Sequence, residues 1–169
     1  MPIQALPGFP PTQNIVEYCI GSAKDSCVYP RILQCLSITG FTKQGLIGTH
    51  ISPGATEEDL KQTFETLRTG GGSNIKQWYI VGNFQKHFQD TKVGWTSVAK
   101  IAKRLRKEFD SGAVYQIADT TALLKSPGCS WGIDICAKRE STSVSYTFAR
   151  AGGAKDKPFT ELGIALTIV

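Results

Sequence analysis

The spacing of apolar side chains changes along this chain and predicts two kinds of element. Short apolar or alternating runs that end at glycine, proline or a polar cluster are typical of strands. Such runs are found at residues 15–20, 31–38, 45–52, 76–82, 113–119, 129–138, 141–150 and 163–169. Apolar residues three or four positions apart instead predict one helix over 56–69 and a second over 94–110.

The first predicted helix carries signals at both of its ends. Thr56 can cap its N-terminus, and the acidic residues at 57–59 suit the positive end of the helix dipole. The glycines at 70–72 then end it. Because these glycines follow a helix instead of joining a strand to one, we interpret them as a helix stop and not as a phosphate-binding loop.

The order of the elements favours an α/β (α+β) fold. The runs at 31–38 and 45–52 are separated by a connection of hairpin length, whereas residues 76–119 alternate strand, helix and strand. We expect a mixed β-sheet or sandwich core with the two main helices packed on it. The first 14 residues carry four prolines and predict an extended N-terminal arm, followed by a single domain over 15–169.

Composition narrows the class of protein. A chain of 169 residues with 41% apolar content can build one sizeable core. No run approaches the roughly 20 apolar residues of a membrane span. The N-terminus has neither the basic start nor the hydrophobic block of a Sec signal peptide. We therefore expect no membrane partner and a cytoplasmic location.

A modest basic excess favours acidic partners without identifying one. The formal net charge is +5 and the sequence pI is about 9.0. Five cations gather on the second predicted helix, opposite its apolar face: Lys100, Lys103, Arg104, Arg106 and Lys107. Such a face can contact a phosphate backbone, but no aromatic residues interleave with the charges to stack on bases. A nucleic-acid partner is therefore less favoured than a solvated helix face.

The cysteines and histidines do not form a metal-binding pattern. The five cysteines are Cys19, Cys27, Cys35, Cys129 and Cys136. They include no CxxC pair and no metal-ligand spacing alongside the two histidines. We expect no metal site and no cofactor. In a reducing compartment most of these thiols would be small core residues.

A Cys-His pair is the chemistry that these residues offer. A nucleophilic thiol needs a base, commonly histidine, that accepts its proton. His50 ends a predicted strand and is held more firmly than His87, which lies in a polar stretch before the second helix. Cys27 follows a polar loop, whereas Cys19 and Cys35 alternate with apolar neighbours in predicted strands. We therefore expect Cys27 and His50 to form the pair.

Two short motifs resemble those of the Cys-His glutamine deamidases. Asp25-Ser26-Cys27-Val28 ends a loop at the thiol, and the glycine-rich strand GLIGTHISP (45–53) ends in His-X-X-Pro. The later stretches IVGNF and GWTSVAKIAKRL match the family pattern more loosely. The element order over about residues 15–120 is similar to that of the chemoreceptor deamidase CheD and of the catalytic domains of the cytotoxic necrotizing factor and lethal-factor toxins.

The resemblance implies a hydrolase that converts an exposed glutamine of a target protein to glutamate. Cys27 would attack the side-chain carboxamide, and His50 would accept and return the proton. The family places a hydroxyl residue ahead of the cysteine, in contact with the imidazole, and we assign this role to Ser22. The partner would be a protein substrate carrying a glutamine. The protein would act in the cytoplasm of its own cell or, as a bacterial toxin or effector, in the cytosol of a host.

Two other interpretations use the same residues. In a non-catalytic binding module, the basic helix and the strands after residue 120 would bind an acidic protein or nucleic acid, with Cys27 and His50 as core residues. A Cys-His protease or acyltransferase would use the same pair and differ in its product. Thiol reactivity distinguishes the binding module, because a catalytic thiol is alkylated faster than a core thiol.

Overall fold

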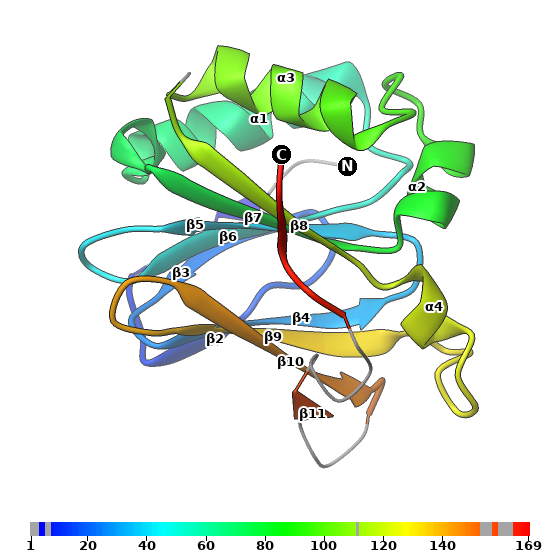
Figure 1. The fold of residues 1–169 in the computed structure, drawn as a ribbon. Coiled ribbons are helices and arrows are strands. Elements are labelled where there is room, and N and C mark those ends of the chain that lie inside the picture. Colours follow the sequence, from blue (N-terminus) through cyan, green and yellow to red (C-terminus); the bar gives the residue numbers. More distant parts are fainter. Residues whose placement is uncertain (1–3, 6–7, 111, 153–156, 159–163) are drawn as a thin grey trace.

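Three layers make up the structure: a layer of helices, a seven-stranded sheet and a five-stranded sheet (Figure 1). A computed structural model of the chain describes residues 4–5, 8–110, 112–152, 157–158 and 164–169. Helices α1 (Glu57–Thr69) and α3 (Val98–Glu108) cover the outer face of the larger sheet, and the two sheets pack against each other. The expected α/β (α+β) fold class is confirmed.

The larger sheet mixes parallel and antiparallel pairs. In spatial order its strands are β1 (Gln4–Ala5), β3 (Cys19–Ala23), β6 (Leu46–Ile51), β5 (Leu36–Phe41), β7 (Gln77–Gly82), β8 (Val114–Asp119) and β12 (Thr167–Ile168). β5 and β6 form the expected hairpin, with Leu36 opposite Ile51. β7 and β8 are parallel and are connected through α2 (Phe84–Asp90) and α3, as a strand-helix-strand pattern requires.

The smaller sheet contains a strand that the sequence pattern did not predict. In spatial order its strands are β11 (Lys157–Pro158), β10 (Val144–Arg150), β9 (Ile133–Arg139), β4 (Ser26–Ile32) and β2 (Thr12–Asn14). β4 pairs with β9 on one side and with β2 on the other, so Cys27 lies inside a strand and not in a loop. The polar residues before Cys27 and the proline at position 30 hide the alternation of this strand in the sequence.

The helices begin and end close to the expected residues. At the start of α1, the Thr56 side chain accepts the N–H of Asp59 and the Asp59 carboxylate accepts the N–H of Thr56, which is a capping box. Gly70 is the C-cap, in agreement with the predicted helix stop. The 3-10 turn η1 (Gly72–Asn74) and the short α4 (Thr121–Leu124) are further helical segments. No helix in the described ranges is long and apolar enough to cross a membrane.

Several predicted boundaries differ from the structure. Residues 15–18, expected to begin a strand, connect β2 of the smaller sheet to β3 of the larger sheet. The run 31–38 is divided, because residues 33–35 lead the chain from the smaller sheet to the larger one. The arm over 1–14 contributes β1 and β2 to the two sheets. Its residues 1–3 and 6–7 lie outside the described residues, as does Gly163 of the last predicted strand.

Candidate functional site

His50 lies where several strands end on one side of the sandwich. β6, β7 and β8 finish there in register with the start of β5, and β4 ends there opposite the start of β9. In Figure 1 this is the side that carries α2 and α4. The segments 15–18, 33–35 and 52–56 connect elements at this side, which we call the His50 end of the sandwich.

The His50 ring is held in one orientation in the core between the sheets. Its Nδ1 lies 3.1 Å from the backbone carbonyl oxygen of Ile15. Because a carbonyl only accepts, Nδ1 carries the proton and Nε2 keeps its lone pair. Nε2 has no hydrogen-bond partner among the residues described. Burial lowers the pKa of His50, against smaller opposing contributions from the Ile15 carbonyl and Glu17, so the neutral ring is suited to accept a proton.

The structure places Cys27 in the same core but does not join it to His50. Cys27 is fully buried between β2 and β9. Two residues along the strand, the Tyr29 ring meets the His50 ring edge-on, with 6.3 Å between the centroids. No hydrogen bond links the thiol to the imidazole, since Nδ1 contacts Ile15 and Nε2 has no partner. Burial, with a smaller contribution from Cys136, raises the pKa of Cys27 to about 12.

Ser22 lies on the opposite face of the larger sheet from His50. It is paired with Ile47, which belongs to the core beneath the helices, and its hydroxyl donates to the Gly8 carbonyl at 2.5 Å. It also lines a cavity of about 300 Å³ that is bordered by the end of α1. The structure therefore does not bring Ser22 to the imidazole, and the carbonyl of Ile15 takes the orienting position.

Cys35, which was expected to be an ordinary strand residue, lies just before β5 in the core between the sheets, and among the described residues no hydrogen bond joins its thiol to the His50 imidazole. Ser37 of β5 is paired with His50 of β6, and Cys35 precedes Ser37 by two residues on the same face. Diagonal neighbours of this kind are about 7–8 Å apart at Cα, within reach of an aromatic side chain. The hairpin register could have predicted that Cys35 is near His50. If Ser37 is paired with His50, the same register places Cys35 opposite Ser52.

The surroundings of Cys35 are polar on one side. Burial is the largest influence on the thiol and, with the Glu17 carboxylate beside it, raises the pKa of Cys35 to about 12. Smaller contributions from the Gln34 backbone and the Ser52 side chain lower that pKa. Glu17 is exposed, and Cys35 itself retains 5% of its accessible surface. Cys35 therefore lies at the edge of the core, near solvent.

Helix α2 holds the segment that carries Cys35. The Asn83 side-chain amide, at the N-cap of α2, donates to the Leu33 carbonyl at 2.8 Å. Nδ1 of His87 lies 3.1 Å from the Gln34 carbonyl. Two consecutive carbonyls before Cys35 are thus bound by one helix, which restricts the position of the thiol. The second histidine of the chain has this structural contact and packs beneath the helices against Trp95.

Cys19 is a third thiol near His50. β3 runs antiparallel to β6 with Ile20 opposite Thr49, which places Cys19 beside His50 on the other side from β5. Its sulfur lies 4.0 Å from the side-chain oxygen of Gln4 in β1. Burial raises the pKa of Cys19. The strand register therefore places Cys19 and Cys35 on either side of His50, whereas Cys27 belongs to the smaller sheet.

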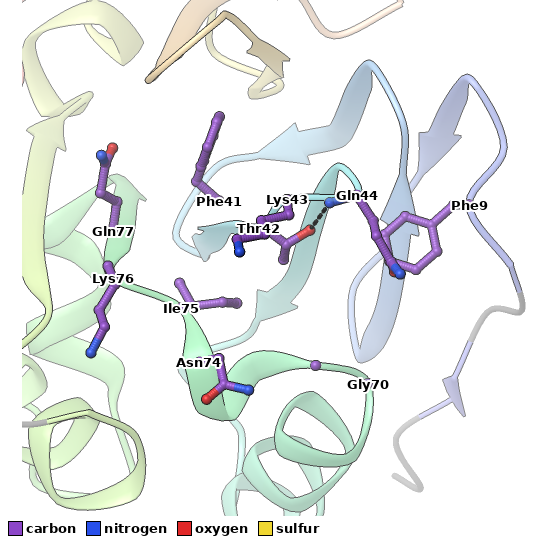
Figure 2. Close-up of a pocket in the computed structure, with 11 residues that line it drawn as sticks. Phe9, Phe41, Thr42, Lys43, Gln44, Gly70, Asn74, Ile75, Lys76 and Gln77 are labelled. Carbon is purple, nitrogen blue, oxygen red and sulfur yellow. Dashed lines mark hydrogen bonds between the residues drawn. The ribbon is translucent and has the colours of Figure 1, made fainter.

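A cavity of about 620 Å³ opens at the other end of the sandwich, between the turn of the β5–β6 hairpin and the segment before β7 (Figure 2). Its apolar lining includes Phe41 and Ile75, and its cations are Lys43 and Lys76. Lys76 forms an ion pair with Asp110. The lining contains no cysteine, histidine or carboxylate, so this cavity is separate from the Cys-His site.

The basic face of α3 is partly used within the fold. Arg104 forms ion pairs with Glu57 of α1 and with Glu108, and Arg106 donates to the Val169 carbonyl. Two of the five expected cations thus bind α3 to its neighbours, which favours a structural role for this face over a nucleic-acid site.

Comparisons with known proteins do not identify this site. No protein-family model, curated protein or solved structure matches the chain. Within the part of the chain that the structure describes, no group of three or more His, Cys, Asp and Glu residues could hold a metal ion.

Proposed function

We propose that the chain is a Cys-His hydrolase that deamidates an exposed glutamine of a target protein. The observation that carries the proposal is the His50 ring, whose Nδ1 is bound to a carbonyl while Nε2 lacks a partner among the described residues. Buried polar atoms are normally paired, so an unpaired Nε2 suits a base. His87 also has an unpaired Nε2, but its ring packs against Trp95 beneath the helices.

We assign the nucleophile to Cys35 and keep Cys27 as the alternative. By extension of the β5–β6 register Cys35 shares a face with His50, and it retains 5% of its accessible surface whereas Cys27 retains none. Cys27 is fully buried near the start of β4, between β2 and β9, where a glutamine side chain would have to displace core residues to reach it. The resemblance of the GLIGTHISP motif to the deamidases supports the role of His50 with either thiol.

The first half of the reaction forms a thioester and releases ammonia. Nε2 of His50 accepts the Cys35 proton as the sulfur attacks the carboxamide carbon, forming the S–C bond and an oxyanion. A backbone N–H near the sulfur, for which that of Gln34 is our candidate, stabilises that oxyanion. The imidazolium then gives its proton to the leaving nitrogen, the C–N bond breaks, and ammonia departs.

The second half regenerates the thiol. A water molecule attacks the thioester carbon while Nε2 of His50 takes one of its protons. The S–C bond then breaks, the sulfur recovers the proton from the imidazolium, and the target residue is left as glutamate. The Glu17 carboxylate, which raises the pKa of His50, stabilises the imidazolium formed in each half.

Ammonia release from a glutamine-rich protein such as β-casein tests the reaction and identifies the thiol. We expect Cys35→Ser and His50→Ala to lower the rate by about 100-fold or more, the usual size of a lost nucleophile or base. Cys19→Ser and Cys27→Ser serve as matched controls and should retain activity. In parallel, iodoacetamide should label Cys35 faster than Cys27, and more slowly in His50→Ala.

Each alternative result has a definite meaning. Loss of activity in Cys27→Ser with retention in Cys35→Ser would transfer the nucleophile to Cys27. No ammonia from the wild-type protein, together with equal labelling of the buried thiols in wild type and His50→Ala, would contradict the deamidase proposal and favour the binding module.

A further inference from the structure

Three large apolar side chains are exposed at the His50 end of the sandwich. Trp131 is 84% exposed, Val16 49% and Leu33 44%. Val16 belongs to the segment whose neighbouring carbonyl orients His50, and Leu33 lies two residues before Cys35. Exposed tryptophan in particular is typical of a protein-binding surface. We call these three side chains the docking patch.

Contacts of the loop before β9 place Trp131 next to the rest of the patch. A side-chain carbon at Gly132 would lie 3.1 to 3.4 Å from backbone atoms of Arg31 and Ile32, so the two segments pack closely. Gly132 also has a φ of +97°, which glycine adopts readily. Trp131 therefore lies beside the end of β4, immediately before Leu33.

The loop that carries Trp131 is organised by its own hydrogen bonds. The Cys129 N–H donates to Ser126 at 3.1 Å, the Gly132 N–H to Cys129 at 2.9 Å, and the Ala151 N–H to Gly132 at 3.1 Å. A side chain held on such a loop loses little further freedom on binding. The backbone that carries the exposed Trp131 is therefore held in place.

Exposed cations flank the docking patch. They are Arg31 at the end of β4, Lys125 after α4 and Arg150 at the end of β10. The carboxylate of Asp134 lies between two backbone donors, the N–H of Arg31 at 2.9 Å and the N–H of Gly152 at 3.3 Å. Its charge is thus partly compensated within the fold. Glu17, next to Val16, is an exposed carboxylate at this end, and the three cations exceed its single charge, which favours an acidic partner.

We propose that the docking patch binds the protein substrate through an acidic segment with apolar side chains that presents its glutamine to the Cys35–His50 site. This inference rests on the proposed deamidase function. Trp131 supplies the apolar anchor, Leu33 and Val16 add apolar contacts next to the segments that carry Cys35 and Ile15, and Arg31 with its neighbouring cations selects acidic flanks. The patch thereby defines the chemical class of substrate, which the catalytic pair by itself does not.

The tryptophan content of the chain allows a direct test. Trp78 and Trp95 are buried, whereas Trp131 is exposed, so quenching of fluorescence by acrylamide reports mainly on Trp131. The probe is a synthetic tryptophan-free peptide of alternating glutamate and leucine around one glutamine. Its matched control has lysine in place of glutamate. The Cys35→Ser protein is used to prevent turnover, and we expect the acidic peptide, but not its lysine counterpart, to protect Trp131.

Variants locate the binding surface. We expect Leu33→Ser and Arg31→Glu, each combined with Cys35→Ser, to weaken protection by about tenfold, a typical effect for a central interface contact. Lys107→Glu is the matched charge reversal on the exposed face of α3 and should leave binding unchanged. A thermal unfolding scan of each variant shows whether a variant with weakened binding is still folded. Leu33→Ser tests the apolar contact of the docking patch without altering its charge.

The outcomes separate the two proposals. Equal protection by both peptides, no protection by either, or loss of binding only in Lys107→Glu would overturn the docking patch. Conversion of the peptide glutamine by the wild-type protein is followed separately by mass spectrometry. Protection of Trp131 without that conversion would leave the patch standing and contradict the deamidase function, whereas conversion without patch-dependent binding would do the reverse.

Discussion

At the scale of single residues, burial determines the resting state of the site. It disfavours the charged form of both the His50 imidazole and the Cys35 thiol, so that the pKa of the histidine is lowered and that of the cysteine is raised to about 12. The pair is therefore neutral at pH 7 and differs from a preformed thiolate–imidazolium pair. The sulfur becomes nucleophilic only while Nε2 of His50 removes its proton.

The pH dependence of deamidation should report this neutral histidine. As pH falls through the pKa of His50, the base becomes protonated and kcat/KM should decline, with the acid limb below pH 6.5. Glu17→Gln should move the limb to lower pH, because the carboxylate raises the pKa of His50. The measurement is ammonia release as a function of pH, with Glu65→Gln on the exposed face of α1 as the control. An acid limb above pH 6.5, or an acid limb that moves to higher pH in Glu17→Gln, would contradict the assignment of His50 as the base.

At the scale of elements, the hairpin and α2 together position the candidate nucleophile. The β5–β6 register sets which residues share a face with His50, and α2 binds the two carbonyls before Cys35. Residues 84–90 were interpreted as a polar loop, although Phe84, His87 and Phe88 have helical spacing. This weak signal competes with four polar neighbours, and the contacts of α2 with the 33–35 segment supply the missing stabilisation.

Asn83→Ala tests the contribution of α2. The change removes the N-cap of α2 and leaves the Leu33 carbonyl without its donor, which should lower the free energy of unfolding by about 2 kcal/mol. Ammonia release should fall further than stability alone explains, because the Cys35 segment is released. Chemical denaturation and activity are measured below the unfolding transition. Ser97→Ala removes the N-cap of α3 as a control, and equal activity in the two variants would show that α2 does not position the thiol.

At the scale of the whole molecule, both histidines are buried and neutral, which links global stability to pH. Burial lowers the pKa of His87 from 6.5 to about 4, against smaller opposing effects of Gln34 and Asp90, and it also lowers that of His50. Between pH 6.5 and pH 4 the unfolded chain therefore binds more protons than the folded chain. The free energy of unfolding is full above pH 6.5 and decreases as the pH falls towards 4. His87 alone accounts for up to about 3 kcal/mol of this loss.

Urea denaturation at several pH values should show this linkage. We expect the free energy of unfolding to decrease from pH 6.5 to pH 4, with a shallower slope in His87→Leu than in the wild type. The variant should also be less stable at pH 7, because it loses the contact with the Gln34 carbonyl. An identical slope in both proteins would show that His87 is accessible to protons in the folded state.

The sequence by itself determined the features that depend on neighbouring residues. The capping box at Thr56, the glycine stop after α1 and the β5–β6 hairpin all follow from contacts within a few positions, and period-two runs predicted most of the buried strands. The choice of His50 over His87 was made on the same local grounds. Its place at a strand end agrees with the structure.

Only the tertiary structure decided which groups meet His50. The Ile15 carbonyl reaches the ring from a segment 35 residues away, and the Cys35 segment is bound by an amide 50 residues away. Ser22, close to Cys27 in sequence, faces away from His50, because neighbours on a strand alternate between faces and Ser22 shares the face of Ile47. Such placements depend on how two sheets and their connecting segments pack, which local residue patterns do not specify.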